Sequence, residues 1–126
     1  MSQKNAPPAA EFDNVQVTAI PYTDADGKVK YKTTFNPTSV EVTTFDTVLN
    51  YQLIEPTPAG VRFSRVSVSP EHNDQLSEPS ISISGKMVTF SDANTVKESL
   101  SLTFHFIDDT GTEFDVDPEV DNFPPI

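Results

Sequence analysis

Hydrophobic and polar residues alternate with a period of two along most of this chain. The clearest case is segment 99–107, in which leucine and phenylalanine alternate with serine, threonine and histidine. Successive side chains of a strand point to opposite faces, so this period indicates strands that each bury one face. The same pattern, rich in β-branched and aromatic residues, predicts strands over 14–22, 28–35, 39–43, 47–54, 61–68, 80–84, 86–91, 99–107 and 112–116.

Glycine and proline fall mainly between these segments. Asp26-Gly27 predicts a hairpin that joins 14–22 to 28–35, because Asp-Gly suits the tight turn between two antiparallel strands. Ser84-Gly85 and Asp109-Thr110-Gly111 predict two further hairpins. Within 61–68 the alternation breaks near Ser64-Arg65, which indicates a β-bulge.

Eight or nine short strands at this spacing predict an all-β fold, an antiparallel two-sheet β-sandwich of immunoglobulin-like architecture. The polar alternate faces favour a sandwich in which each sheet has one face in water. Phe104 and Phe106 are expected in the core because they continue the two-residue spacing of Leu100 and Leu102 and so point to the same face. The full predicted core is Val15, Val17, Tyr31, Val40, Val42, Val48, Leu53, Phe63, Val66, Val68, Ile81, Ile83, Val88, Phe90, Leu100, Leu102, Phe104, Phe106 and Phe114.

The length of 126 residues fits one domain. Residues 1–13 are polar and contain Pro7-Pro8, so we expect a flexible arm, followed by a single domain over 14–126 that ends in an acidic segment, 108–126. No apolar run reaches the length of a signal peptide or a membrane span. We therefore expect a cytoplasmic protein without a membrane partner.

Charge is strongly negative and uneven. The formal net charge is −11, and eight acids with no Lys or Arg lie from Glu98 to the end. Phosphate backbones repel such a surface, so no nucleic-acid partner is expected.

Residue types that carry catalysis are sparse. There is no cysteine, the histidines are His72 and His105 only, and no nucleotide-binding or nucleophile-elbow motif is present. Asp24-Ala25-Asp26-Gly27 resembles the start of a calcium loop, but Lys28 and Phe35 stand where later ligands are required. The sequence therefore predicts no catalytic residue, no cofactor and no enzyme.

The C-terminal segment is the most distinctive. Asp115, Asp117, Glu119 and Asp121 occur at every second residue, so an extended chain would place all four on one edge. Three partners could compensate this row: a calcium ion bound by the four carboxylates, a strand face bearing Lys28, Lys30 and Lys32, or water.

Two family resemblances rest on short motifs. Asp117-Pro118-Glu119 and Glu55-Pro56 resemble the DP-EP family, a group of small bacterial proteins, over most of the chain. The ending DVDPEVDNFPPI is similar to the end of a cadherin repeat, which implies calcium binding by its acidic residues. Neither resemblance carries a catalytic mechanism onto this chain.

Together these patterns favour a non-catalytic binding or interaction module. Its partner, a protein or a small ligand, is left open, and oligomerisation is compatible with the sequence. One alternative is a calcium-dependent adhesion-type module that uses the C-terminal carboxylates. A second is a hydrolase that uses a pair of carboxylates.

Overall fold

The computed structural model describes residues 11–71 and 73–125 as ten strands. Within those ranges there is no helix, and so none long and apolar enough to cross a bilayer. The strands are β1 (Phe12–Thr23), β2 (Val29–Asn36), β3 (Ser39–Val42), β4 (Thr47–Leu53), β5 (Arg62–Ser69), β6 (Ser80–Ile81), β7 (Met87–Asp92), β8 (Ser99–Ile107), β9 (Glu113–Val116) and β10 (Glu119–Asn122).

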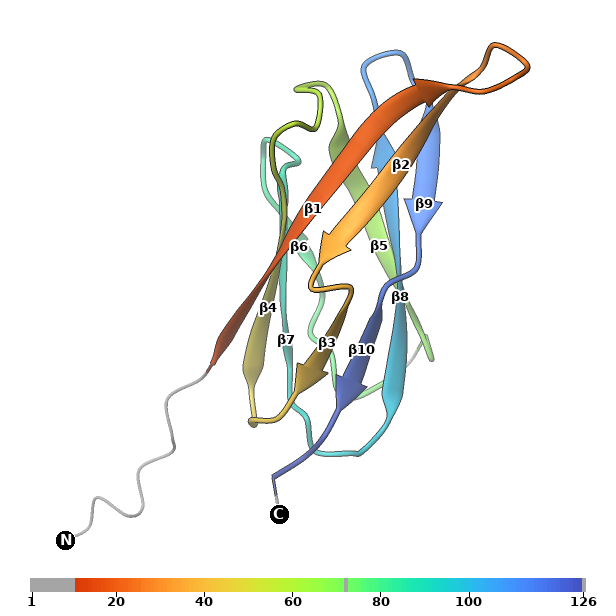
Figure 1. Cartoon of the computed structure of the whole chain (residues 1–126). Helices are drawn as coiled ribbons and strands as arrows, with labels where there is room; N and C mark the ends of the chain where they lie inside the picture. Colours follow the sequence, from red (N-terminus) through yellow and green to blue (C-terminus); the bar gives the residue numbers. More distant parts are fainter. Residues whose placement is uncertain (1–10, 72, 126) are drawn as a thin grey trace, which may run out of the picture.

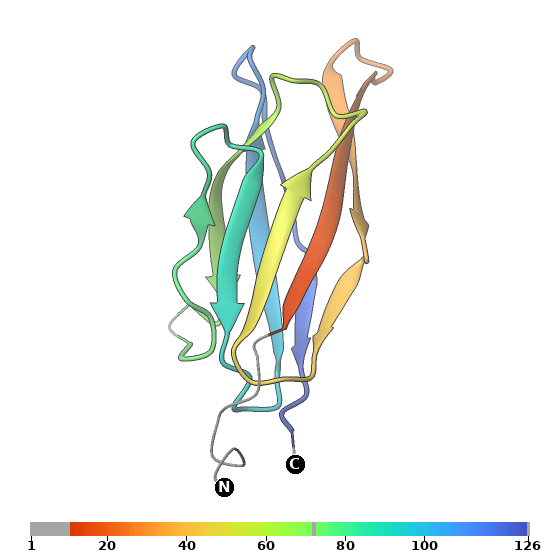
Figure 2. The ribbon, with the colours of Figure 1, turned by 90° about the vertical axis from the view of Figure 1, so that its left-hand side faces the viewer.

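The strands form two layers along the long axis of an elongated molecule (Figure 1). The first sheet has the order β2-β1-β4-β7-β6, and Figure 2 looks onto it, with β8 of the other layer behind β4 and β7. The second sheet has the order β3-β10-β8-β5, and β9 also pairs with β8. This arrangement confirms an all-β, two-sheet sandwich.

Each sheet contains one parallel pair, so both sheets are mixed rather than purely antiparallel. The C-terminal part of β1 pairs antiparallel with β2, while its N-terminal part runs parallel to β4. In the second sheet β10 runs parallel to β3 and antiparallel to β8. β1 begins at Phe12, inside the segment 1–13 that was expected to be an arm. Residues 1–10 of that expected arm lie outside the described residues.

The three expected hairpins and the bulge are confirmed. In the first hairpin Gly27 has a φ of 79° and donates its N–H to Asp24 O, while Asp24 Oδ1 accepts the N–H groups of Asp26 and Lys28. The β6–β7 and β8–β9 turns are closed by Gly85 N to Ser82 O and by Gly111 N to Asp108 O. The register between β5 and β8 shifts between Phe63 and Arg65, where the bulge was predicted.

The core lies between the sheets and is rich in aromatic rings. Phe104 and Phe106 are fully buried, as predicted, and Phe104 meets Tyr51 with ring centroids 4.5 Å apart. Two members of the predicted core are wrong. Val48 points to the outer face because Leu49 takes the inward position, and Ile83 lies in the β6–β7 turn, fully exposed. The core also contains residues that the prediction left out, namely Ala19, Phe35, Leu49, Tyr51, Val61 and Val120.

The acidic C-terminal segment is part of the second sheet. β9 and β10 lie end to end along β8 in one unbroken register, in which Val116 pairs with Phe104 and Val120 pairs with Leu100. Pro118 separates them because it has no N–H to donate to β8. Its carbonyl still accepts the N–H of Leu102 at 3.0 Å, which keeps the register intact.

Candidate functional site

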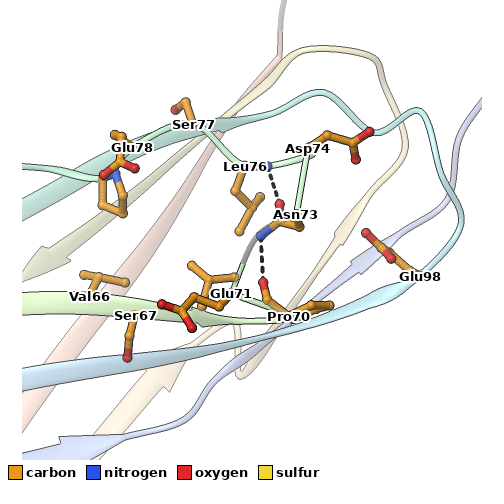
Figure 3. Close-up of a pocket in the computed structure, with 12 residues that line it drawn as sticks. Val66, Ser67, Pro70, Glu71, Asn73, Asp74, Leu76, Ser77, Glu78 and Glu98 are labelled. Carbon is orange, nitrogen blue, oxygen red and sulfur yellow. Dashed lines mark hydrogen bonds between the residues drawn. The ribbon is translucent and has the colours of Figure 1, made fainter.

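A groove of about 800 Å³ lies beside the edge strand β5 (Figure 3). One side is β5, and the other is formed by residues 70–71 and 73–79, which lead from β5 toward β6. The lining residues are Val66, Ser67, Val68, Pro70, Glu71, Asn73, Asp74, Leu76, Ser77, Glu78, Pro79 and Glu98.

Asn73 shapes the turn that separates the two sides of the groove. Its side-chain Oδ1 accepts the N–H groups of Gln75 and Leu76, both at 2.9 Å, and its Nδ2 donates to Pro70 O at 3.0 Å. Asparagine commonly makes such local bonds to backbone groups a few residues away. The chain therefore reverses direction directly after β5 and returns alongside it.

Gln75 anchors the returning segment to the sandwich. The residue is buried, and its Oε1 accepts the N–H of Thr95 at 2.8 Å and the Nδ2 of Asn122 at 3.2 Å. Its backbone carbonyl accepts the N–H of Ala93. Further along, Ser77 N donates to Ser91 O at 2.9 Å. These bonds hold the wall of the groove against β7 and β10, so the groove is preformed.

The groove combines an apolar floor with an acidic rim. Val66, Val68 and Leu76 pack against the core but are only partly buried. The carboxylates of the rim come from the side of the groove opposite β5 and from the residue directly before β8 (Figure 3), and they belong to Glu71, Asp74, Glu78 and Glu98. No Lys or Arg occurs among the described lining residues.

A second, smaller hollow shares Glu98 with the groove. It encloses about 480 Å³ and is lined by Lys97, Glu98, Ser99, Glu119, Asp121, Asn122 and Phe123. Within it, Ser99 Oγ donates to Asp121 Oδ1 at 2.6 Å, and the Lys97 ammonium lies 5.9 Å from the ring centroid of Phe123. Acidic side chains thus continue from the groove around this end of the sandwich.

The predicted calcium ligands lie in a row along the outer face of the second sheet. Asp115, Asp117 and Glu119 are exposed and Asp121 is partly exposed, which agrees with the parity read from the sequence. Side chains two residues apart on a strand are separated by about 7 Å, too far to surround one ion. Throughout the described ranges, no three His, Asp or Glu side chains come together as a metal site.

The structure places the lysines away from this acidic row. β2, which follows Lys28 and carries Lys30 and Lys32, is the edge of the first sheet, whereas the acidic row belongs to the second. Tyr31 makes the contact between β2 and β9, stacking on Phe114 with ring centroids 4.3 Å apart. Among the described side chains, Arg62 and Asp109 form an ion pair at 3.6 Å and His105 lies 3.8 Å from Asp115, and neither contact uses these lysines.

A polar row crosses three neighbouring strands on the same outer face. Ser67 Oγ lies 3.4 Å from His105 Nε2, and His105 Nδ1 lies 3.8 Å from Asp115 Oδ2. This order of atoms is that of a Ser-His-Asp triad, in which the acid is normally buried and bonded to the imidazole. Here the Asp115 side chain is 62% exposed and the contact is longer than a hydrogen bond. His72, the other histidine, lies outside the described residues.

Sequence reasoning missed the groove. It predicted no strand between 61–68 and 80–84 and no site there, although Pro70 and Pro79 bracket three acids. That local excess of acids was the available signal. What it could not show was that Gln75 fixes the segment opposite the edge of β5.

Comparison with known proteins identifies the family. The match to the DP-EP family covers residues 8–124, nearly the whole chain. That description names no reaction, ligand or partner. A search of curated proteins gave no match. Both motifs that suggested the family fall within the matched range, Asp117-Pro118 at the junction of β9 and β10 and Glu55-Pro56 in the loop after β4. The chain belongs to the DP-EP family.

Proposed function

We propose that this protein is a non-catalytic binding module whose site is the groove beside β5 and whose ligand is cationic. The observation that carries this proposal is the composition of the groove. Four carboxylates surround a partly exposed apolar floor, and the described lining contains no basic side chain to neutralise them. A concave site with an apolar floor and a few convergent polar groups is the usual form of a ligand site.

Electrostatics favours a positive ligand at this position. Like charges gathered around a hollow raise the local concentration of counter-ions and speed the association of oppositely charged partners. The same field repels phosphate groups, in line with the expectation of no nucleic-acid partner. An apolar floor adds affinity for ligands that carry hydrocarbon beside their charge, such as lysine or arginine side chains.

The test is a calorimetric titration with an eight-residue oligolysine at low ionic strength. One variant combines Glu71→Gln, Asp74→Asn and Glu78→Gln. The control combines Asp26→Asn, Glu55→Gln and Glu113→Gln, which removes the same charge from exposed positions outside the groove. We expect the groove variant to bind at least about threefold more weakly, since exposed ion pairs each contribute about 0.2–1 kcal/mol. Equal binding by both variants would refute the proposal.

A serine hydrolase is the second candidate, because of the row formed by Ser67, His105 and Asp115. Its test is the hydrolysis of p-nitrophenyl acetate by the protein and by Ser67→Ala. Turnover that disappears in Ser67→Ala would support it. Turnover that is equal in both proteins would exclude it. We favour the binding module because the acid of the row is exposed and lies beyond hydrogen-bonding distance of the imidazole.

A further inference from the structure

The open edge of β5 presents unpaired backbone groups to the groove. Leu102 of β8 donates its N–H to Pro118 O, so the backbone groups of Leu102 face away from β5. Leu102 is the register partner of Val68, and Val66 pairs with Phe104, two residues along. In an antiparallel pair the N–H and C=O groups of two facing residues point either both toward each other or both away from each other, and the two cases alternate along the strands. The N–H and C=O groups of Val66 and Val68 therefore point to the open edge.

These backbone groups have no hydrogen-bond partner elsewhere in the described part of the chain. β5 pairs with β8 on one side only. Before the bulge, Phe63 donates its N–H to Gly85 O at 2.8 Å, which closes that end of the edge. Beyond the bulge the edge stays open beside the groove (Figure 3). An unpaired strand edge is a template for another strand.

The side chains at this edge show what such a strand would cover. Val66, Val68 and Leu76 contact the core from one side and remain partly exposed on the other. The polar rim beyond them carries the carboxylates of Glu71 and Glu78. A strand laid here would direct alternate side chains toward the apolar floor and the others toward the outside, within reach of the acids.

We infer that the ligand of the groove is an extended peptide segment that adds to β5 as a further strand. Lysine or arginine would alternate in it with apolar residues. This inference rests on the proposed function and names its ligand. The backbone of the peptide bonds to Val66 and Val68, its apolar side chains complete the floor, and its basic side chains meet the rim. Strand addition obtains affinity from main-chain hydrogen bonds and specificity from alternate side chains.

The experiment uses three eight-residue peptides of alternating lysine and valine: one unmodified, one N-methylated at the valine amides and one at the lysine amides. In an antiparallel addition, valines opposite Val66 and Val68 donate to β5. Methylation of the valine amides then weakens binding about tenfold, and methylation of the lysine amides has little effect. A parallel addition reverses the two outcomes. In either case the unmodified peptide slows hydrogen exchange at the Val66 and Val68 amides.

Two protein variants test the edge itself. Val68→Pro removes the N–H that faces the groove, a change that an edge strand tolerates, and Val68→Ala is its control because it keeps the N–H. We expect weaker binding by Val68→Pro than by Val68→Ala.

Equal binding of all three peptides, without added protection of Val66 and Val68, would overturn strand addition and leave the cationic site intact. If the groove variant with three neutralised acids also binds equally, the proposed function fails as well. Protection of Val66 and Val68 that rises with protein concentration in the absence of peptide would identify a second copy as the occupant and overturn the inference.

Discussion

The hydroxyl of Tyr31 donates a 2.6 Å hydrogen bond to Oδ2 of Asp108, joining the edge of the first sheet to the β8–β9 turn of the second. The other carboxylate oxygen, Oδ1, accepts from Thr110 N, Thr110 Oγ1 and Thr112 N. Burial, followed by the bond to Asp108, raises the pKa of Tyr31 to about 12. The Tyr31 bond and then that of Thr110 lower the pKa of Asp108 to about 2.

This pair predicts a loss of stability in acid. The folded pKa of Asp108 lies below its ordinary value of 3.8, so its contribution is complete above about pH 4 and disappears as the pH falls toward 2. In Tyr31→Phe the pKa of Asp108 rises toward 3.8, and stability should depend less on pH in that window. Thermal melts from pH 5 to pH 2 measure the effect, with Tyr22→Phe, an exposed tyrosine, as the control. If the melting temperature of Tyr31→Phe falls between pH 5 and pH 2 as much as that of the unaltered protein, this account is wrong.

Phe104→Ala should destabilise the fold by about 3–5 kcal/mol, because the ring is fully buried and its removal leaves a cavity. The ring meets Tyr51 and Phe63 edge-on, so both lose packing partners. Urea unfolding measures the change. Ile83→Ala is the control, since Ile83 is fully exposed and its loss should cost less than about 0.5 kcal/mol. A cost below about 1 kcal/mol for Phe104→Ala would show that its surroundings collapse to fill the space.

Removal of residues 115–126 should abolish cooperative unfolding at every salt and calcium concentration. The deletion takes away β10, which lies between β3 and β8, together with the buried Val120. The cause is loss of sheet and core, which salt and calcium do not restore. Thermal melts followed by near-ultraviolet circular dichroism provide the measurement, and removal of Pro125 and Ile126 alone is the control. A truncated protein that melts cooperatively near the temperature of the full chain would contradict the role of β10.

Gln75→Ala should weaken both the fold and the groove. The substitution deprives Thr95 N and Asn122 Nδ2 of their acceptor, and Asn122 is buried, so its unsatisfied amide alone costs about 1–3 kcal/mol. The wall opposite β5 also loses its anchor, so oligolysine should bind more weakly. Urea unfolding and calorimetry measure the two effects, with Gln52→Ala on an exposed face as the control. If Gln75→Ala lowers stability but leaves oligolysine binding unchanged, Gln75 supports the fold but is not needed for the binding site.

Local patterns were sufficient for the strands and their turns. Alternation located nine of the strands, and Asp26-Gly27 and the irregularity at Ser64-Arg65 marked a hairpin and a bulge because their causes lie within a few residues. Errors arose where alternation was ambiguous. Val48 and Leu49 are adjacent and both apolar, and only the opposite sheet decides which points inward. Ile83 follows Ile81 by two residues, so alternation places both on one face, but β6 ends at Ile81 and Ile83 lies in the turn.

Contacts between distant segments were outside the reach of the sequence. β10 has Val120 as its single core residue and is otherwise acidic or polar, so its composition resembles a solvated tail. The strands of the parallel pairs β1–β4 and β3–β10 are not joined by a short turn, so no local sequence signal predicts that they pair. The groove depends on the bond between Gln75 and Asn122, residues 47 positions apart. The parity of the four C-terminal acids was predictable, whereas the apolar Tyr31–Phe114 contact that links β2 to β9 was not.

The insertion of β10 between β3 and β8 has a consequence for biosynthesis. Among the described strands β3 pairs with β10 alone, so Val40 and Val42 leave the ribosome long before their partner strand has been made. Domains that fold during translation do so only when their pairing segments have emerged. The second layer of this sandwich cannot be completed until residues 119–122 have been made, and the nascent chain carries exposed apolar strands until then.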